Sequence, residues 1–240
     1  MKRLKLLFLL LPILCLVSCN DESGEYVNQL FTEQEMVIAL KQCVTACVDT
    51  ANAHLSVVEV NNYGFESYSS GIYKIGLPIH YQYVIDSLVQ HGHSELIASF
   101  GHNLNIAASS CGNAIRNYVT TSLADFNFIS PLALLHGDSV AIVDFFYTMS
   151  QVSFLGMLKS QVSLQPTYRE AETQWNEICT LYQQYTGQNI SLDLRVQVAE
   201  QMLYGIYEEM KREEILIRTD VSHRGNSTGK MYSVFGNFEK

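Results

Sequence analysis

Four charged residues near the C-terminus have the types and spacing of a catalytic or ion-pair site. Glu213 and Glu214 are adjacent, Arg218 lies four residues after Glu214, and Arg224 follows. On a helix of about 100° per residue, the two glutamates fall about 50° to either side of the centre of an apolar stripe. Glu214 and Arg218 also have the order that favours an i,i+4 ion pair on a helix.

These charged residues permit two interpretations. In the first, Glu213 or Glu214 is the catalytic carboxylate of a hydrolase, with an arginine beside it. In the second, the carboxylates and guanidinium groups form a charge lock that holds the C-terminal segment against the rest of the domain. The second interpretation is favoured, because charges that flank an apolar stripe must be paired when they are buried.

The sequence predicts neither a metal site nor a cofactor. None of the seven histidines forms an i,i+4 pair, and the chain has no H-E-x-x-H and no C-x-x-C motif. A stretch at 225–230 resembles a phosphate-binding loop, but it has one residue too few between its glycines. Met231 also occupies the position where Ser or Thr would bind magnesium.

The N-terminus has the pattern of a lipoprotein signal. Three basic residues within the first five precede an apolar run at 6–17 that is too short to be a permanent membrane helix. Ser18 and Cys19 then complete a lipobox, in which the cysteine is acylated and becomes the new N-terminus. We therefore expect residues 1–18 to be removed and Cys19 to anchor the protein in a bacterial envelope membrane, with the outer membrane favoured.

Residues 19–31 are predicted to form an acidic flexible tether. Removing residues 1–18 takes away three of the 15 Lys and Arg and none of the 24 Asp and Glu, which leaves a formal net charge of −12. This balance disfavours nucleic acid and anionic membrane surfaces as direct partners. The acidic residues after Cys19 resemble a surface-export signal, so the sequence leaves both a surface-facing and a periplasm-facing position open.

Four cysteines remain for the domain: Cys43, Cys47, Cys111 and Cys179. An exported compartment permits disulfides, but two cysteines at i,i+4 on one helix are poorly placed to bond each other. Two alternatives follow, a bridge that reaches Cys111 or Cys179, or four buried free thiols that pack as small apolar side chains.

Residues 56–77 lack helical periodicity and are rich in Asn, Ser, Gly and Tyr, which predicts one long ordered loop. Its aromatic residues include Tyr63, Phe65, Tyr68 and Tyr73. These rings either bind a protein or glycan partner, or they fix the loop to the domain by burying themselves.

The rest of the chain has helical periodicity almost throughout. Thr32 and Glu35 form a capping box, and Pro78 suits the first turn of a later helix. The pattern predicts helices beginning after 32 and spanning about 78–90, 94–122, 131–137, 138–158, 167–185 and 192–218. We therefore expect a single all-α bundle of about six to eight helices over residues 32–236, followed by a tail at 237–240.

Several short motifs follow one another along this domain: Ile75-x-Leu77-Pro78, Asn105-x-Ala107-Ala108, Leu134-Leu135-x-Gly137 and Glu213-Glu214-x-x-Ile217-Arg218-x-Asp220. In this order they resemble the bacterial family catalogued as domain of unknown function 4197, over about residues 33–236. Tyr204 and Val221 depart from the family pattern, which has Asp and Pro there. The resemblance implies a helical, usually lipobox-bearing exported protein, and it implies no activity.

Together these features predict a lipid-anchored cell-envelope protein that acts as a binding or assembly module for an envelope protein or glycan. The alternative is an envelope hydrolase that uses Glu213 or Glu214. A water-open cleft at these carboxylates would favour the hydrolase, whereas a dry ion pair would favour the module.

Overall fold

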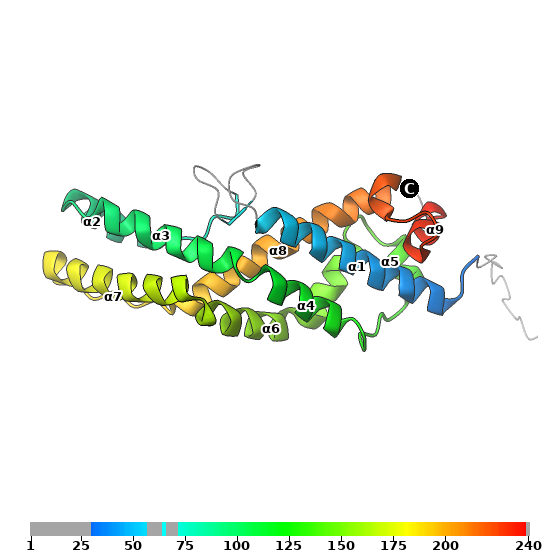
Figure 1. Cartoon of the computed structure of the whole chain (residues 1–240), viewed down its shortest axis with the longest axis horizontal. Helices are drawn as coiled ribbons and strands as arrows, with labels where there is room; N and C mark the ends of the chain where they lie inside the picture. The colour runs from blue at the N-terminus through cyan, green and yellow to red at the C-terminus, as the bar shows by residue number, and fades with distance from the viewer. Residues whose placement is uncertain (1–29, 57–63, 66–71, 239–240) are drawn as a thin grey trace, which may run out of the picture. The chain divides into compact units, whose positions relative to one another are not determined.

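The computed structural model describes residues 30–56, 64–65 and 72–238. The expected signal at 1–18, most of the tether at 19–31, Tyr63, Tyr68 and the last two residues of the tail lie outside this part of the chain. The described residues form helices and no strand, so the predicted all-α fold class is confirmed (Figure 1). The elements are α1 Glu33–Leu55, 3₁₀ helix η1 Ile79–Tyr81, α2 Gln82–Gln90, α3 Ser94–Ser109, α4 Gly112–Ser122, α5 Pro131–His136, α6 Ala141–Leu164, α7 Pro166–Thr186, α8 Leu194–Thr219, 3₁₀ helix η2 Val221–Arg224 and α9 Lys230–Gly236.

Helix α1 begins where its capping box predicts. The Thr32 hydroxyl accepts the Glu35 N–H at 3.2 Å, and the Glu35 carboxylate accepts the Thr32 N–H at 2.9 Å. Two N–H groups that the first turn leaves without helical partners are thereby satisfied. The apolar face that follows, at helical spacing from Met36 to Leu55, is buried.

Helix α8 lies at the centre of the helical unit formed by residues 31–238. It packs against α1 on one side and α6 on the other, while α2 and α3 pack along α7 (Figure 1). Helices α4 and α9 also pack against α1. The buried apolar side chains of these helices form one continuous core, so α8 contributes residues both to this core and to the surface beside α6.

The predicted helix at 94–122 is two helices in the structure. The chain turns at Ser110 and Cys111, where the Cys111 N–H bonds to the carbonyl of Ala108 in a tightened turn. Helix α4 then starts at Gly112, which approaches α1 so closely that a Cβ would lie 2.2 Å from the Asn52 Oδ1. Helix α9 was not predicted, because a seven-residue helix has too little periodicity to recognise and depends on packing for its stability.

Helix α6 is long and apolar enough to cross a membrane, and among the described residues it alone passes this test of length and composition. One face of it, which includes Ile142, Phe146, Phe154 and Leu158, is buried within the protein. Its packing against α8 accounts for the apolar residues of that face, whereas Met149, Val152 and Leu164 are exposed.

An extended segment at 74–78 is fixed between α3 and α8 by two side-chain amides, which we call the amide clamp. Asn105 accepts the Ile75 N–H and donates to the Ile75 carbonyl, both at 2.8 Å. Gln201 makes the same two bonds to Gly76, both at 2.9 Å. Successive residues of an extended chain direct their backbone groups to opposite sides. Helix α3 therefore binds one edge of the segment through Asn105, and α8 binds the other edge through Gln201.

The described part of the predicted aromatic loop packs against α8. Phe65 and Tyr73 are buried, and a Cβ at Gly205 would lie 3.2 Å from the Phe65 ring and 3.3 Å from Tyr73. The absence of a side chain at Gly205 therefore allows the two rings to lie on the helix. These rings belong to the core and are not presented to a partner.

Candidate functional site on helix α8

Three carboxylates on helix α8 are buried: those of Glu209, Glu213 and Glu214. The helix begins at Asp193, whose side chain accepts the Val196 N–H at 3.0 Å. From that start, helical geometry brings the three glutamates to the region where α8 meets α1 and α6. Buried carboxylates require partners, and each of these three has a different set.

Glu214 pairs with Arg218, and we call these two residues the capping pair. Arg218 donates from Nε and Nη2 to the Glu214 Oε1 at 3.0 and 2.8 Å. The Glu214 side chain is 0% exposed and that of Arg218 is 9% exposed. The spacing in the sequence predicts this contact, and the structure shows that the paired side chains are almost inaccessible to solvent.

The capping pair also completes the ends of two other helices. Glu214 accepts the N–H groups of Ile142 and Val143 at 3.1 and 2.7 Å, in the first turn of α6, where the Val140 side chain provides no cap. Arg218 donates to the carbonyls of Leu135 and Leu134 at 2.9 and 3.0 Å, in the last turn of α5. An anion at a helix N-terminus and a cation at a C-terminus also match the helix dipoles.

Burial raises the pKa of Glu214 above its ordinary value. The Val143 N–H and the positive charge of Arg218 act in the opposite direction, because both stabilise the ionised carboxylate, but burial is the larger effect. Glu214 is therefore a carboxylate whose charge depends on Arg218 and on two backbone N–H groups.

Arg224 and Glu213 extend the same arrangement to the end of α8. Arg224 is buried, and it donates from Nε to the Ile217 carbonyl at 2.8 Å and from Nη2 to the Arg218 carbonyl at 2.9 Å. Glu213 lies 2.9 Å from the His223 Nδ1 of η2. The structure thus brings all four predicted charged residues to one end of α8, where they join it to α5, α6 and η2.

Glu209 is a third buried carboxylate that the sequence interpretation missed. Its Oε2 lies 2.7 Å from the His54 Nδ1 at the end of α1, and its Oε1 lies 3.5 Å from Arg212. Burial, followed by the negative charge of Glu209, raises the pKa of Tyr73. Glu209 lies four residues before Glu213, on the same face of the helix, so its burial could have been predicted from the spacing. Nothing in the sequence indicated that its partner is His54.

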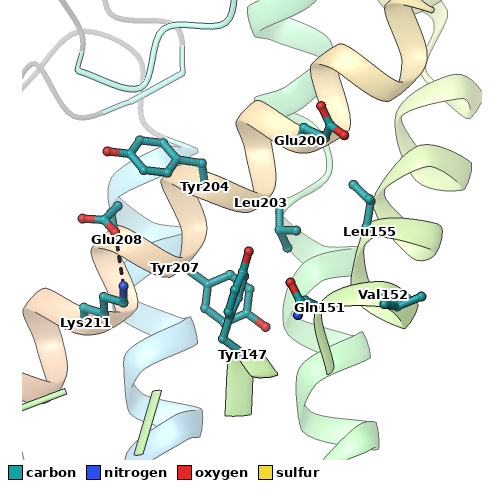
Figure 2. A pocket seen from close by; sticks show the side chains of 10 residues that line it. All are labelled: Tyr147, Gln151, Val152, Leu155, Glu200, Leu203, Tyr204, Tyr207, Glu208 and Lys211. Atoms are coloured by element: carbon teal, nitrogen blue, oxygen red, sulfur yellow. Dashed lines mark hydrogen bonds and ion pairs between the residues drawn. The ribbon is translucent and has the colours of Figure 1, made fainter. Parts of the chain in front are cut away.

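A groove of about 460 Å³ lies between α6 and α8, and we call it the α6–α8 groove (Figure 2). Its lining residues are Tyr147, Gln151, Val152, Leu155, Glu200, Leu203, Tyr204, Tyr207, Glu208 and Lys211. Tyr207 is buried and forms part of the floor, where its hydroxyl lies 2.8 Å from the Ser150 Oγ and its ring is 4.2 Å from the Tyr147 ring. Val152 and Tyr204 remain 83% and 61% exposed.

The charges along this groove are mainly negative. Lys211 lies 3.3 Å from Asp144 and 3.5 Å from Glu208, so its positive charge is already neutralised. Glu200 is exposed on the same side of α8. The sequence interpretation missed this groove, although α6 carries no charged residue over 145–158, which is a signal of an apolar surface.

Neither Glu213 nor Glu214 lines the α6–α8 groove, a groove beside Ile75 and Phe100, or a groove beside Tyr168 and Trp175. Both carboxylates are buried, Glu214 against Arg218 and Glu213 against the partly exposed His223. Where the structure is described, no group of three or more His, Cys, Asp or Glu side chains is placed to hold a metal ion.

The four cysteines of the domain are free thiols in the structure. Cys43, Cys47 and Cys111 are buried, and Cys179 is partly buried. Burial raises the pKa of Cys47 well above its ordinary value and that of Cys111 to about 12. Because the thiolate is the reactive form, these two cysteines are poor nucleophiles.

The residues 225–229 read G-x-S-x-G, the pattern of a serine-hydrolase elbow. In that elbow the serine lies on a tight turn between a strand and a helix. Here the turn follows the 3₁₀ helix η2, and Ser227 is exposed. The structural context therefore does not match the motif.

The model of a family described as "Protein of unknown function (DUF4197)" matches residues 30–236. No curated protein and no solved structure gives a significant match to the chain.

Proposed function

Since the chain belongs to the DUF4197 family of proteins of unknown function, we propose a function from its surface: it is a lipid-anchored binding module of the bacterial envelope, and it holds a protein partner in the α6–α8 groove. Cys19 provides the anchor and residues 20–31 the tether. The groove provides the contact.

The observation that carries this proposal is the exposed apolar and aromatic lining of the groove. Val152 from α6 and Tyr204 from α8 are largely exposed beside a floor that includes the buried Leu203 and Tyr207 (Figure 2). Exposed apolar surface of this kind is typical of interaction sites, and tyrosines often supply much of the binding energy at protein interfaces. Tyr204 also stands where the family pattern has Asp, so this surface differs within the family.

The lining favours a protein partner over a glycan. Val152, Leu155 and Leu203 are aliphatic and form no hydrogen bonds with sugar hydroxyls. They match the apolar side chains of a peptide segment, and the exposed Glu200 matches a basic residue on it. Tyr147 and Tyr204 suit either kind of partner.

The hydrolase interpretation has less support. General acid–base catalysis requires a carboxylate within hydrogen-bond reach of a substrate. Glu214 uses its oxygens on Arg218 and on the first turn of α6, and it is fully buried. A residue in this position stabilises the fold.

The anchor is tested by replacing the acylated cysteine. The Cys19→Ala protein should remain an uncleaved precursor and lose incorporation of an alkyne fatty-acid probe, because no thiol would be left in the lipobox. Cys15→Ala is the matched control and should label like the natural protein. Normal labelling of the Cys19→Ala protein would contradict the proposed anchor.

The groove is tested by photocrosslinking in cells. A benzophenone side chain at position 152 should yield a discrete protein adduct, whereas the same side chain at Ile79, which is equally exposed but lies on η1, should not. Adding Tyr204→Ala should lower the adduct yield about tenfold, the loss expected of an interface tyrosine. The melting temperature should hardly change, because Tyr204 is exposed.

Two results would overturn the groove proposal. One is the same adduct pattern at positions 152 and 79, and the other is an adduct that is insensitive to Tyr204→Ala. An adduct that glycosidases reduce to the mass of the uncrosslinked protein would replace the protein partner with a glycan.

A further inference from the structure

A second and larger groove, of about 810 Å³, lies where the segment at 74–77 and α2 meet α3, and we call it the α3 groove. It is formed by the segment at 74–77, by Ile85 of α2 and by residues 97–102 and 105 of α3. Its lining residues are Lys74, Ile75, Gly76, Leu77, Ile85, Ile97, Ala98, Ser99, Phe100, Gly101, His102 and Asn105. Small-molecule sites have volumes of about 300–1,000 Å³ and mostly apolar linings with a few polar groups, and this groove has both properties.

Two glycines border the α3 groove. A Cβ built at Gly76 or at Gly101 has no atom within 4 Å, so the backbone at these positions borders open space. Around them, Ile75 and Phe100 are buried, and Leu77, Ile85 and Ile97 are partly buried. The resulting wall is aliphatic over most of its length.

One wall of this groove is rigidly held. The amide clamp fixes Ile75 and Gly76 through four hydrogen bonds of 2.8 and 2.9 Å. Asn105 also donates to the Gly101 carbonyl at 2.6 Å, so its amide is fully used within the protein. The groove is therefore preformed, which lowers the cost of binding, but it has few hydrogen-bonding groups for a polar ligand.

The charge of the α3 groove is opposite to that of the protein. Among the described residues, Lys74 is the one charged residue in its lining and no carboxylate lines it, in a chain with 24 Asp and Glu. Within residues 30–56, 64–65 and 72–238, no carboxylate forms an ion pair with Lys74. The exposed His102 lies on the α3 side of the same groove.

We propose that the α3 groove binds a free single-chain amphiphile with an anionic head, such as a long-chain carboxylate. The aliphatic chain lies along Ile75, Ile97 and the open backbone at Gly101, and the head lies at Lys74. The apolar lining accounts for the chain, the exposed positive charge of Lys74 accounts for the head, and the small number of hydrogen-bonding groups argues against sugars and nucleotides. This site is separate from the α6–α8 groove and does not depend on its partner.

The binding test uses the chain from residue 20 onward, because the compact unit lies at 31–240, and 11-(dansylamino)undecanoic acid as the fluorescent probe. Saturated carboxylates of 8 to 14 carbons, kept below their micelle concentrations, should displace the probe. The Kd should fall about fourfold for each added methylene, the factor expected for burying one CH₂, until the chain outgrows the groove. An alkyltrimethylammonium of equal length should bind at least about tenfold more weakly.

Gly101→Leu is the sharpest variant, because a Cβ at this position meets no atom within 4 Å and the rest of the side chain would occupy the groove. It should weaken carboxylate binding at least about tenfold, and it should not lower the melting temperature, since leucine favours a helix more than glycine does. Gly156→Leu on α6 is the matched control, because a Cβ there also has no atom within 4 Å, and its binding should equal that of the natural protein. Lys74→Glu should weaken binding of the carboxylate but not of the alcohol of the same length.

Three results would overturn the proposal: no saturable displacement by any chain length, unchanged binding by the Gly101→Leu protein, or equal affinity for the carboxylate and the ammonium head. Binding to anionic vesicles without binding of free chains would also overturn it, since it would indicate a membrane surface. Tyr204→Ala should leave carboxylate binding unchanged, which separates this site from the α6–α8 groove.

Discussion

Arg218→Ala is expected to lower the free energy of unfolding by about 3–5 kcal/mol, the range for breaking a buried ion pair. The change would leave the Glu214 carboxylate, which is fully buried, without its cation. It would also remove the donors to the carbonyls of Leu134 and Leu135 at the end of α5. Urea denaturation followed by circular dichroism measures the loss.

Arg116→Ala is the matched control. Arg116 pairs with Asp49 at 2.6 Å, but their side chains are 48% and 41% exposed. An exposed pair of this kind contributes at most about 1 kcal/mol. Equal losses for Arg116→Ala and Arg218→Ala would contradict the role assigned to the capping pair.

The loss caused by Arg218→Ala should grow with pH. Burial already holds the pKa of Glu214 above its ordinary value, and removing the positive charge of Arg218 should raise that pKa further. A carboxyl with a raised folded pKa stabilises the protein fully below its unfolded pKa, near 4.3, and loses this contribution as pH rises through the folded value. The difference between the two proteins should therefore be smallest near about pH 4 and largest near about pH 8.

Two double variants separate the two roles of Glu214, which are to pair with Arg218 and to accept hydrogen bonds from the first turn of α6. Glu214→Gln with Arg218→Leu removes both charges but keeps one side-chain acceptor for the first turn of α6, and it should recover part of the loss. Glu214→Leu with Arg218→Leu should recover less, because the N–H groups of Ile142 and Val143 would lose their acceptor. One result would contradict the structural role: an Arg218→Ala protein that melts like the natural one yet loses its photocrosslinked partner. It would mean that the capping pair acts in partner binding and not in stability.

Asn105→Ala is expected to cost about 3 kcal/mol, because it would leave the N–H and the carbonyl of Ile75 buried without partners, at about 1–3 kcal/mol for each group. Gln201→Ala should cost less, about 1 kcal/mol, since its bonds to Gly76 are partly exposed. Urea denaturation gives both values, and hydrogen exchange at the Ile75 amide should accelerate in the Asn105→Ala protein.

Asn103→Ala is the control for the amide clamp. Asn103 lies on the same helix with similar burial, but it donates only to the Gln174 side chain, at 3.1 Å. Its replacement should cost no more than about 1 kcal/mol. A loss for Asn105→Ala that does not exceed this value would mean that the segment at 74–78 is held by packing rather than by the clamp.

The family motifs gain a structural meaning from these contacts. Asn105 of one motif hydrogen-bonds the backbone of Ile75 in the motif before it, so the two motifs are joined in the fold. Leu134 and Leu135 of a third motif are capped by Arg218 of the last. These motif residues therefore hold separate helices of the fold together.

The features that could be predicted from the sequence are those that depend on neighbours along the chain. The start of α1 follows from its capping box, because Thr32 and Glu35 are three residues apart. The contact between Glu214 and Arg218 follows from i,i+4 spacing on one helix, and the all-α class follows from apolar periodicity. These features are local because helical hydrogen bonds join residues only four apart.

The roles of those residues depend on contacts between distant parts of the chain, which the sequence did not predict. Glu214 caps a helix that begins about 70 residues earlier, and Glu209 pairs with His54 on α1, 155 positions away. The α6–α8 groove likewise combines two helices that are separated in the chain by α7. Periodicity shows which face of a helix is buried, but it does not show which helix covers that face, because this is decided by how all the helices pack together around one core.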